Sequence, residues 1–159
     1  MKRLIVGIAD AKISKSPADE LITFSLGSCL GIIFYDSVLR IGAMIHSMLP
    51  DEAIDSGKNF NPYKYVNSGL PLVLGKLFAM GVAKDNLKIK VAGGAQILDS
   101  NSFFNIGARN FEMLREVLRE HNLRIHNRDV GDMVNRTVIL QMSDGNVKVK
   151  RSDKGLISL

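Results

Sequence analysis

The sequence predicts a layered α+β or α/β sandwich in a single domain that covers residues 1–159. Three observations support this prediction. Short apolar runs rich in β-branched residues dominate the first fifty residues and return near the end of the chain. Two longer segments in the middle have apolar residues at the spacing of a helix face. The chain has 159 residues, of which 46% are hydrophobic and 23% charged, and this composition suits one compact domain.

Four strand-like runs are expected in the N-terminal third of the chain. They lie at residues 4–9, 21–25, 30–35 and 40–47. Asp36 and Ser37 have the chemistry of a turn between the last two runs, which predicts an antiparallel hairpin there. The polar segment 51–62 that follows predicts an exposed loop.

Two helices are expected in the middle of the chain. The first covers residues 63–81, where Pro71 must either kink the helix or mark the start of its regular part. Gly81 is a suitable residue to end this helix. A strand is expected at residues 87–91. The second helix follows Asn105, a plausible cap, and its apolar face consists of Ile106, Phe111, Leu114, Val117 and Leu118.

The C-terminal third returns to strands, which are expected at residues 123–125, 137–142 and 147–149. The segment Asp144-Gly145-Asn146 predicts a tight turn between the last two. The whole pattern predicts two helices and about eight strands, and the strands at both ends of the chain are expected to pair in antiparallel fashion.

The net charge of +5 and the isoelectric point near 9.4 favour an anionic partner. The distribution of charge argues against nucleic acid, because most arginines alternate with acidic residues as on a solvated surface. These arginines are Arg109, Arg115, Arg119, Arg124 and Arg128. A cluster mostly of one sign is formed only by Lys148, Lys150, Arg151 and Lys154. We therefore expect no binding to nucleic acid.

The chain contains one cysteine and no apolar segment long enough to span a bilayer. A single cysteine excludes an internal disulfide, which favours a reducing compartment. The apolar run at residues 4–9 is too short for a signal peptide. We expect a cytoplasmic protein that does not insert into a membrane.

The candidate nucleophile is the only cysteine, Cys29, in the segment Gly27-Ser28-Cys29-Leu30-Gly31. A thiolate is a strong nucleophile when a base takes its proton. The glycines allow a sharp turn in which the amides of Ser28 and Cys29 are free to bind an oxyanion and to favour a thiolate. The spacing is that of a nucleophile elbow, but a strand-like run follows where that fold requires a helix. A lone cysteine is otherwise more often a buried core residue.

His46 is the candidate base, because it is the only titratable side chain in the apolar run 41–49 and burial keeps an imidazole neutral. A single histidine in such a run is by itself more often a core residue. Thr23 can supply a hydroxyl that orients the imidazole, although threonine is also a common strand residue. His121 and His126 lie in polar, turn-like stretches and are expected at the surface. The spacing of these residues matches no metal site or phosphate loop, so neither a metal nor a cofactor is expected.

Two segments together form a specific pattern, Thr23-Phe24-Ser25-Leu26-Gly27-Ser28-Cys29 and Gly42-Ala43-Met44-Ile45-His46-Ser47-Met48-Leu49-Pro50. Three further segments follow in order, Gly93-Gly94-Ala95, Ile106-Gly107-Ala108-Arg109-Asn110 and Asp129-Val130-Gly131 with Arg136. With these segments the chain resembles the CheD family of chemoreceptor glutamine deamidases over nearly its whole length. Two positions depart from the family pattern. Ser25 stands where glycine is common, and Asp132 stands where a second glycine is expected.

The resemblance implies an α/β/β sandwich similar to that of the cytotoxic necrotizing factor deamidases, with a Cys-His-Thr triad. By position, Cys29 is the nucleophile, His46 the general base and acid, and Thr23 the residue that orients His46. The family converts particular receptor glutamines to glutamates without a cofactor, and some members also hydrolyse methyl esters at related positions. The implied partners are the cytoplasmic helices of chemoreceptors, as substrate, and the CheC phosphatase.

Two functions of other classes are compatible with the same residues. A papain-like cysteine peptidase or a transglutaminase uses Cys-His chemistry, and assays of peptide cleavage or amine incorporation distinguish these enzymes from a deamidase. The second alternative is that the chain is chiefly a regulatory binding module. In that case a Cys29→Ala protein would still stimulate the phosphatase. The basic net charge would complement receptor helices that are rich in glutamate.

Overall fold

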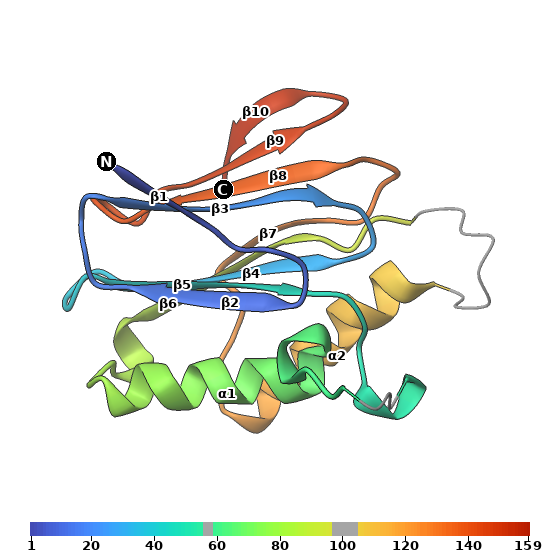
Figure 1. Cartoon of the computed structure of the whole chain (residues 1–159), viewed down its shortest axis with the longest axis horizontal. Helices are drawn as coiled ribbons and strands as arrows, with labels where there is room; N and C mark the ends of the chain where they lie inside the picture. The colour runs from blue at the N-terminus through green and yellow to red at the C-terminus, as the bar shows by residue number, and fades with distance from the viewer. Residues whose placement is uncertain (56–58, 97–104) are drawn as a thin grey trace.

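The computed structural model describes residues 1–55, 59–96 and 105–159 of the chain. In these residues, two sheets and two α-helices form three layers (Figure 1). The helices, Val66–Ala79 (α1) and Ile106–Glu120 (α2), cover one face of the inner sheet. The outer sheet packs on the opposite face of the inner sheet. This arrangement confirms the predicted α/β/β sandwich.

The inner sheet has the strand order β2-β5-β4-β6-β7. Its strands are Asp10–Ser14 (β2), Leu30–Asp36 (β4), Ile41–Ser47 (β5), Leu87–Gly93 (β6) and Asn127–Val130 (β7). The pairing is antiparallel except between β6 and β7, which run parallel. The predicted hairpin is confirmed, because β4 and β5 pair in antiparallel fashion around the turn at Asp36 and Ser37.

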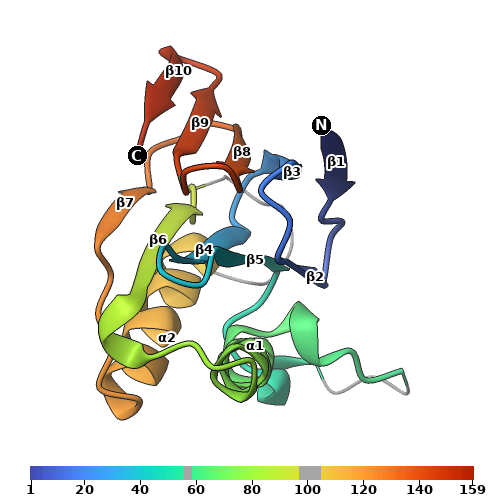
Figure 2. The ribbon, with the colours of Figure 1, turned by 90° about the vertical axis from the view of Figure 1, so that its left-hand side faces the viewer.

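The outer sheet has the strand order β1-β3-β8-β9-β10. Its strands are Lys2–Ile5 (β1), Asp19–Leu26 (β3), Arg136–Gln141 (β8), Val147–Arg151 (β9) and Gly155–Ser158 (β10). The C-terminal strands pair antiparallel as expected, but β1 and β3 pair parallel. Between these two strands the chain crosses to the inner sheet and forms β2, so it returns to the outer sheet in its original direction (Figure 2).

The strands β4 and β5 are buried at every position because apolar layers lie on both of their faces. Side chains alternate between the faces, so Ile32 packs toward the helices and Ile33 toward the outer sheet. On β5, Ile45 packs toward the helices and Met44 toward the outer sheet. His46 therefore faces the space between the two sheets.

The helices differ from the prediction mainly at their first residues. The segment Pro62–Lys64 forms a separate 3-10 turn, so α1 begins later than expected and contains Pro71 in its interior. Gly81, with a φ of 96°, follows the end of α1 as predicted. Before α2, Asn105 has a φ of 55°, and its side chain makes no capping hydrogen bond with the described residues. Asn105 occupies the N-cap position as predicted, but its side chain does not cap the described amides, because a capping side chain reaches the helix amides from an extended backbone.

Three strand predictions were incomplete or wrong. The run 4–9 is divided, because the chain turns after β1 and Ala9 has a φ of 56°. The run 123–125 is a connection, since Leu123 and Ile125 pack against the core on the helix side while β7 begins two residues later. The sequence pattern did not predict β2 or β10. Within the predicted loop 51–62, residues 56–58 lie outside the described part of the chain.

A buried charge cluster joins β7, β8 and β9 beside the end of the inner sheet. Arg136, with a fully buried side chain, donates to Asp129 at 2.9 Å. Its Nη1 also donates to the carbonyl oxygens of Gly93 and Gly131, at 3.2 and 2.9 Å. Arg151 pairs with the second oxygen of Asp129 at 2.7 Å. One guanidinium group thus holds the end of β6, the end of β7 and the turn that follows.

Replacement of Arg136 by methionine is expected to lower the free energy of unfolding by about 3 kcal/mol, because Asp129 and two carbonyl groups lose a buried donor. Urea denaturation of the variant and the wild type measures this difference. The matched control is Lys150→Met, an exposed change on β9 with an expected effect below about 0.5 kcal/mol. An Arg136→Met protein as stable as the wild type would contradict a stabilising role for the cluster.

Candidate active site

His46 lies near the end of β5, between the two sheets, with 2% of its surface exposed. Its Nδ1 lies 2.8 Å from Oγ1 of Thr23, on β3 of the outer sheet. The same hydroxyl donates to the carbonyl oxygen of Val6 at 2.7 Å. The structure therefore brings together the predicted base and the residue predicted to orient it.

The hydrogen bonds of Thr23 determine the tautomer of His46. A threonine hydroxyl has one proton and a carbonyl oxygen can only accept, so this proton is donated to Val6. Oγ1 then accepts the proton on Nδ1, and Nε2 of His46 carries the free lone pair. Nε2 is buried and has no hydrogen-bond partner among the described residues. An imidazole in this state can accept a proton from a nucleophile.

Cys29 lies in the turn between β3 and β4, at the rim of the core between the sheets. Gly31 is the residue of β4 that pairs with His46, and Cys29 lies two residues before Gly31. Cys29 lies in the turn that leads into β4, so the register places this turn at the end of the sheet where His46 lies on β5. Nε2 of His46 makes no hydrogen bond with the thiol of Cys29 or with any other described residue.

The turn that contains Cys29 is held by all three of its carbonyl groups. The three hydrogen bonds, of 2.9 to 3.0 Å, join Gly27 to Ala95, Ser28 to Asn110, and Cys29 to Gly94. The backbone amides of Ser28 and Cys29, in contrast, have no backbone acceptor in the described part of the chain. Rigidly held amides next to the sulfur are suitable donors for an oxyanion.

Burial controls the protonation of both candidate groups. It raises the pKa of the Cys29 thiol to about 11, and a hydrogen bond from the backbone amide offsets this only in part. Burial also lowers the pKa of His46 from its ordinary value of 6.5, as predicted. The resting pair at neutral pH is a neutral thiol and a neutral imidazole. The backbone amide favours the thiolate, as expected, but the loss of solvent outweighs this effect.

Gly93 allows the end of β6 to pass directly behind the cysteine turn. It has a φ of 114°, a conformation that side chains disfavour, and a Cβ at this position would collide with the carbonyl oxygen of Cys29. Gly94, the next residue, donates to that carbonyl. Because Arg136 binds the carbonyl of Gly93, the buried charge cluster supports the position of the turn.

Asn110 on α2 connects the cysteine turn to the end of the histidine strand. Its side chain is fully buried, and Nδ2 donates to the carbonyl oxygens of Ser28 and Met48, both at 3.0 Å. One amide group therefore positions both segments of the candidate site. In the sequence, Asn110 was recognisable only as part of the family-like segment Ile106-Gly107-Ala108-Arg109-Asn110. The available signal was its position, four residues before Leu114, among the apolar side chains of an amphipathic helix.

The two positions that depart from the family pattern both have a left-handed backbone. Ser25 and Asp132 each have a φ of 56°, a conformation that glycine adopts with little strain. Ser25 lies at the irregularity of β3 between Thr23 and Leu26, next to the site. Glycine is therefore the residue expected at both positions on physical grounds, and these two side chains are accommodated at a cost of about 1 kcal/mol each.

The two other histidines of the chain do not form a metal site with neighbouring side chains in the described residues. His121 and His126 interact with backbone atoms near the opposite end of α2. Within residues 1–55, 59–96 and 105–159, no three His, Cys, Asp or Glu side chains are placed to hold a metal ion. None of the helices in these residues has the length and apolar character needed to cross a membrane.

Comparison with known proteins extends over most of the chain. The family model described as CheD chemotactic sensory transduction matches residues 48–151. A Syntrophus aciditrophicus protein named "Probable chemoreceptor glutamine deamidase CheD 1" is 39% identical over 153 residues, 96% of this chain and 96% of that protein. A Solibacter usitatus protein named "Probable chemoreceptor glutamine deamidase CheD" is 35% identical over 155 residues, 97% of this chain and 92% of that protein.

A solved structure of a Neisseria meningitidis protein of the DUF152 family is similar to the fold. The two structures superpose with a TM-score of 0.50 and 10% sequence identity. The match covers 84% of this chain and 63% of that chain. At this level of identity the similarity concerns the sandwich architecture alone.

Near neutral pH, His46 is expected to carry its proton on Nδ1, because Oγ1 of Thr23 accepts it. Thr23→Val keeps the shape of the side chain but removes the hydroxyl, and is expected to abolish this preference. Thr23→Ser, the matched control, is expected to preserve it. Long-range ¹H–¹⁵N NMR spectra distinguish the two tautomers. A wild-type spectrum with the proton on Nε2 would contradict the assignment.

Alkylation of Cys29 by iodoacetamide is expected to accelerate about ten-fold for each pH unit between pH 7 and pH 10, because only the thiolate reacts. The folded protein holds the pKa of this thiol at about 11, so no plateau is expected in that range. Intact-mass spectrometry measures the rate. The urea-unfolded chain is the control, and its rate should level off near the ordinary pKa of 9.0. A plateau below pH 8 in the folded protein would indicate a resting thiolate instead.

Proposed function

Because the chain belongs to the CheD family, we propose that it is a chemoreceptor glutamine deamidase. Its substrates are glutamine side chains on the cytoplasmic helices of chemoreceptors, and its products are glutamate and ammonia. The proposed catalytic domain comprises residues 1–159 and acts in the cytoplasm. The observation that carries the proposal is the bond between Thr23 and His46, which leaves a buried Nε2 free at the end of the sheet where the turn with the only cysteine of the chain lies.

The proposed reaction begins with attack of the Cys29 sulfur on the carboxamide carbon of glutamine, while His46 takes the thiol proton. Both groups are neutral at rest, so proton transfer accompanies the attack and does not precede it. Rotation of the cysteine side chain in the bound complex brings Sγ toward Nε2. Thr23 keeps the ring oriented and stabilises the imidazolium that forms.

The negative charge of the tetrahedral intermediate develops on the former amide oxygen. We assign the backbone amides of Ser28 and Cys29 as its donors, because the bound carbonyl groups of the turn hold these amides in place before the substrate arrives. The imidazolium of His46 then protonates the nitrogen of the intermediate, the C–N bond breaks, ammonia leaves, and a thioester remains on Cys29. Water activated by the same imidazole hydrolyses this thioester, which yields glutamate and restores the thiol. These steps require no metal and no cofactor.

Two finer parts of the proposal come from the family resemblance. A glutamate methyl ester presents the same carbonyl carbon to Cys29, with methanol as leaving group, so ester hydrolysis is a second proposed reaction. The CheC phosphatase is the proposed regulatory partner. A Cys29→Ala protein that still stimulates the phosphatase would show that the regulatory role does not require the nucleophile.

Incubation with the cytoplasmic domain of a chemoreceptor is expected to convert particular glutamines to glutamates with release of ammonia. Cys29→Ala and His46→Ala should abolish the conversion, and Thr23→Ala should slow it about a hundred-fold. Peptide mass spectrometry locates the modified residues, and an enzymatic ammonia assay gives the rate. Thr23→Ser is the matched control and should retain most of the activity.

The same experiment distinguishes the alternatives. Incorporation of an added primary amine in place of hydrolysis would identify a transglutaminase, and shortened peptides would identify a peptidase. A Cys29→Ala protein that deamidates the receptor domain at the wild-type rate would overturn the proposed mechanism.

A further inference from the structure

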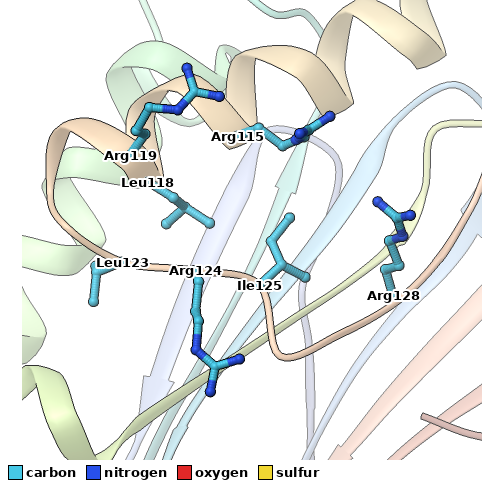
Figure 3. A pocket seen from close by; sticks show the side chains of 7 residues that line it. All are labelled: Arg115, Leu118, Arg119, Leu123, Arg124, Ile125 and Arg128. Carbon is cyan, nitrogen blue, oxygen red and sulfur yellow. The ribbon is translucent and has the colours of Figure 1, made fainter.

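A hollow with a volume of about 330 Å³ lies between the second half of α2 and the connection that leads to β7 (Figure 3). Four arginine side chains surround it, and the other lining residues are apolar. The arginines are Arg115, Arg119, Arg124 and Arg128. The apolar residues are Leu118, Leu123 and Ile125. We call this feature the arginine hollow.

The fold gathers charges that look balanced in the sequence. Arg115 and Arg119 are four residues apart, so they lie on the same side of α2 although two glutamates are close to them in sequence. The chain then reverses and carries Arg124 and Arg128 back along the helix (Figure 3). Among the residues that the structure describes, the lining of the hollow includes no acidic side chain. These arginines lie on a solvated surface, as expected, but the fold brings four of them together around one hollow.

Most of this positive charge has no acidic partner in the described part of the chain. Arg115 pairs with Glu112 at 3.5 Å, and no ion pair is found for the other three arginines among the described residues. The guanidinium group of Arg128 lies over the ring of Phe111, 5.4 Å from its centroid. All four arginines are exposed. An anionic ligand would relieve the repulsion among them.

The shape of the arginine hollow favours an acidic peptide over a small anion. Arg119 and Arg124 point their guanidinium groups to opposite sides, and the side chains of Leu118 and Ile125 lie between them (Figure 3). A phosphate-sized ion needs donors that converge on one point. A peptide can instead pair its carboxylates with the separate arginines and place an apolar side chain against the leucine and isoleucine residues between them.

Both walls of the arginine hollow lead to the candidate active site. On α2, Asn110 contacts the cysteine turn, and Leu118 lies eight residues later, about 12 Å further along the helix axis. On the other wall, β7 ends at Val130, which pairs with Gly93 behind the turn. A helical protein substrate in the site can therefore reach the arginine hollow within a few turns.

We propose that the arginine hollow is a docking site for an acidic segment of the protein substrate. The arginine hollow lies about 12 Å along α2 from Asn110, and a helical substrate rises 1.5 Å per residue. The acidic segment of such a substrate is therefore expected on the order of eight residues from the modified glutamine. This inference rests on the proposed function, since it assigns part of the substrate to a surface beyond the catalytic residues. Contacts there act on substrate affinity and leave the chemistry at Cys29 unchanged.

The test compares two double variants with the same change in charge. Arg119→Glu with Arg124→Glu alters the arginine hollow, whereas Lys150→Glu with Lys154→Glu alters exposed lysines on and after β9. The substrates are the cytoplasmic helical domain of a chemoreceptor and a short glutamine peptide without acidic residues. Circular dichroism and thermal unfolding confirm that both variants fold.

The arginine variant is expected to raise the KM for the receptor domain about ten-fold at low salt without changing kcat, and to leave the short peptide unaffected. The lysine variant should raise the KM less than about two-fold. High salt should remove most of the difference between the two variants. Equal effects in both variants, or no effect in either, would overturn the proposed docking site.

A second measurement separates this inference from the proposed function. Fluorescence anisotropy of the labelled receptor domain measures binding to Cys29→Ala protein with and without the arginine substitutions. Binding that weakens about ten-fold supports the docking site even if no deamidation occurs. Deamidation that proceeds with unchanged binding and unchanged KM contradicts the docking site and leaves the proposed function intact.

Discussion

The site depends on one hydroxyl proton. Thr23 donates it to the carbonyl of Val6, so its oxygen accepts from Nδ1 of His46 and the opposite ring nitrogen keeps a free lone pair. Thr23 belongs to the outer sheet and His46 to the inner sheet, so the tautomer is set only when the two sheets pack face to face. The packing of the two sheets thus holds the imidazole of His46 in one neutral tautomer.

The second requirement is a rigid turn around the sulfur. Three carbonyl groups of this turn are bound from two directions, by the end of β6 and by Asn110 on α2. The end of β6 is fixed in turn by the buried Arg136. Cys29 and His46 are both neutral at rest, and the amides of the turn are firmly held. In the proposed reaction, charge therefore appears at this site only while a substrate is bound. Such a site avoids the energetic cost of a buried thiolate while no substrate is bound.

The sequence allowed prediction of the layered fold, the central hairpin and the proximity of Thr23 to His46, because local apolar patterns and a specific motif carry that information. It did not allow prediction of the parallel pairing of β1 with β3, which depends on a crossover between sheets. Asn110 and Arg136 were missed as supports because their partners are distant in sequence. The arginine hollow was missed because alternating charges in a sequence separate only after a helix and its return connection fold together.

A thioester on Cys29 is the most direct evidence for the account as a whole. Acid quenching during the first turnover, followed by intact-mass measurement of the protein, detects such an adduct. The account predicts a transient increase equal to the mass of a short glutamine substrate minus ammonia, confined to the peptide that contains Cys29 and absent in His46→Ala. Glutamate that accumulates while the protein carries no adduct at any time would contradict the account.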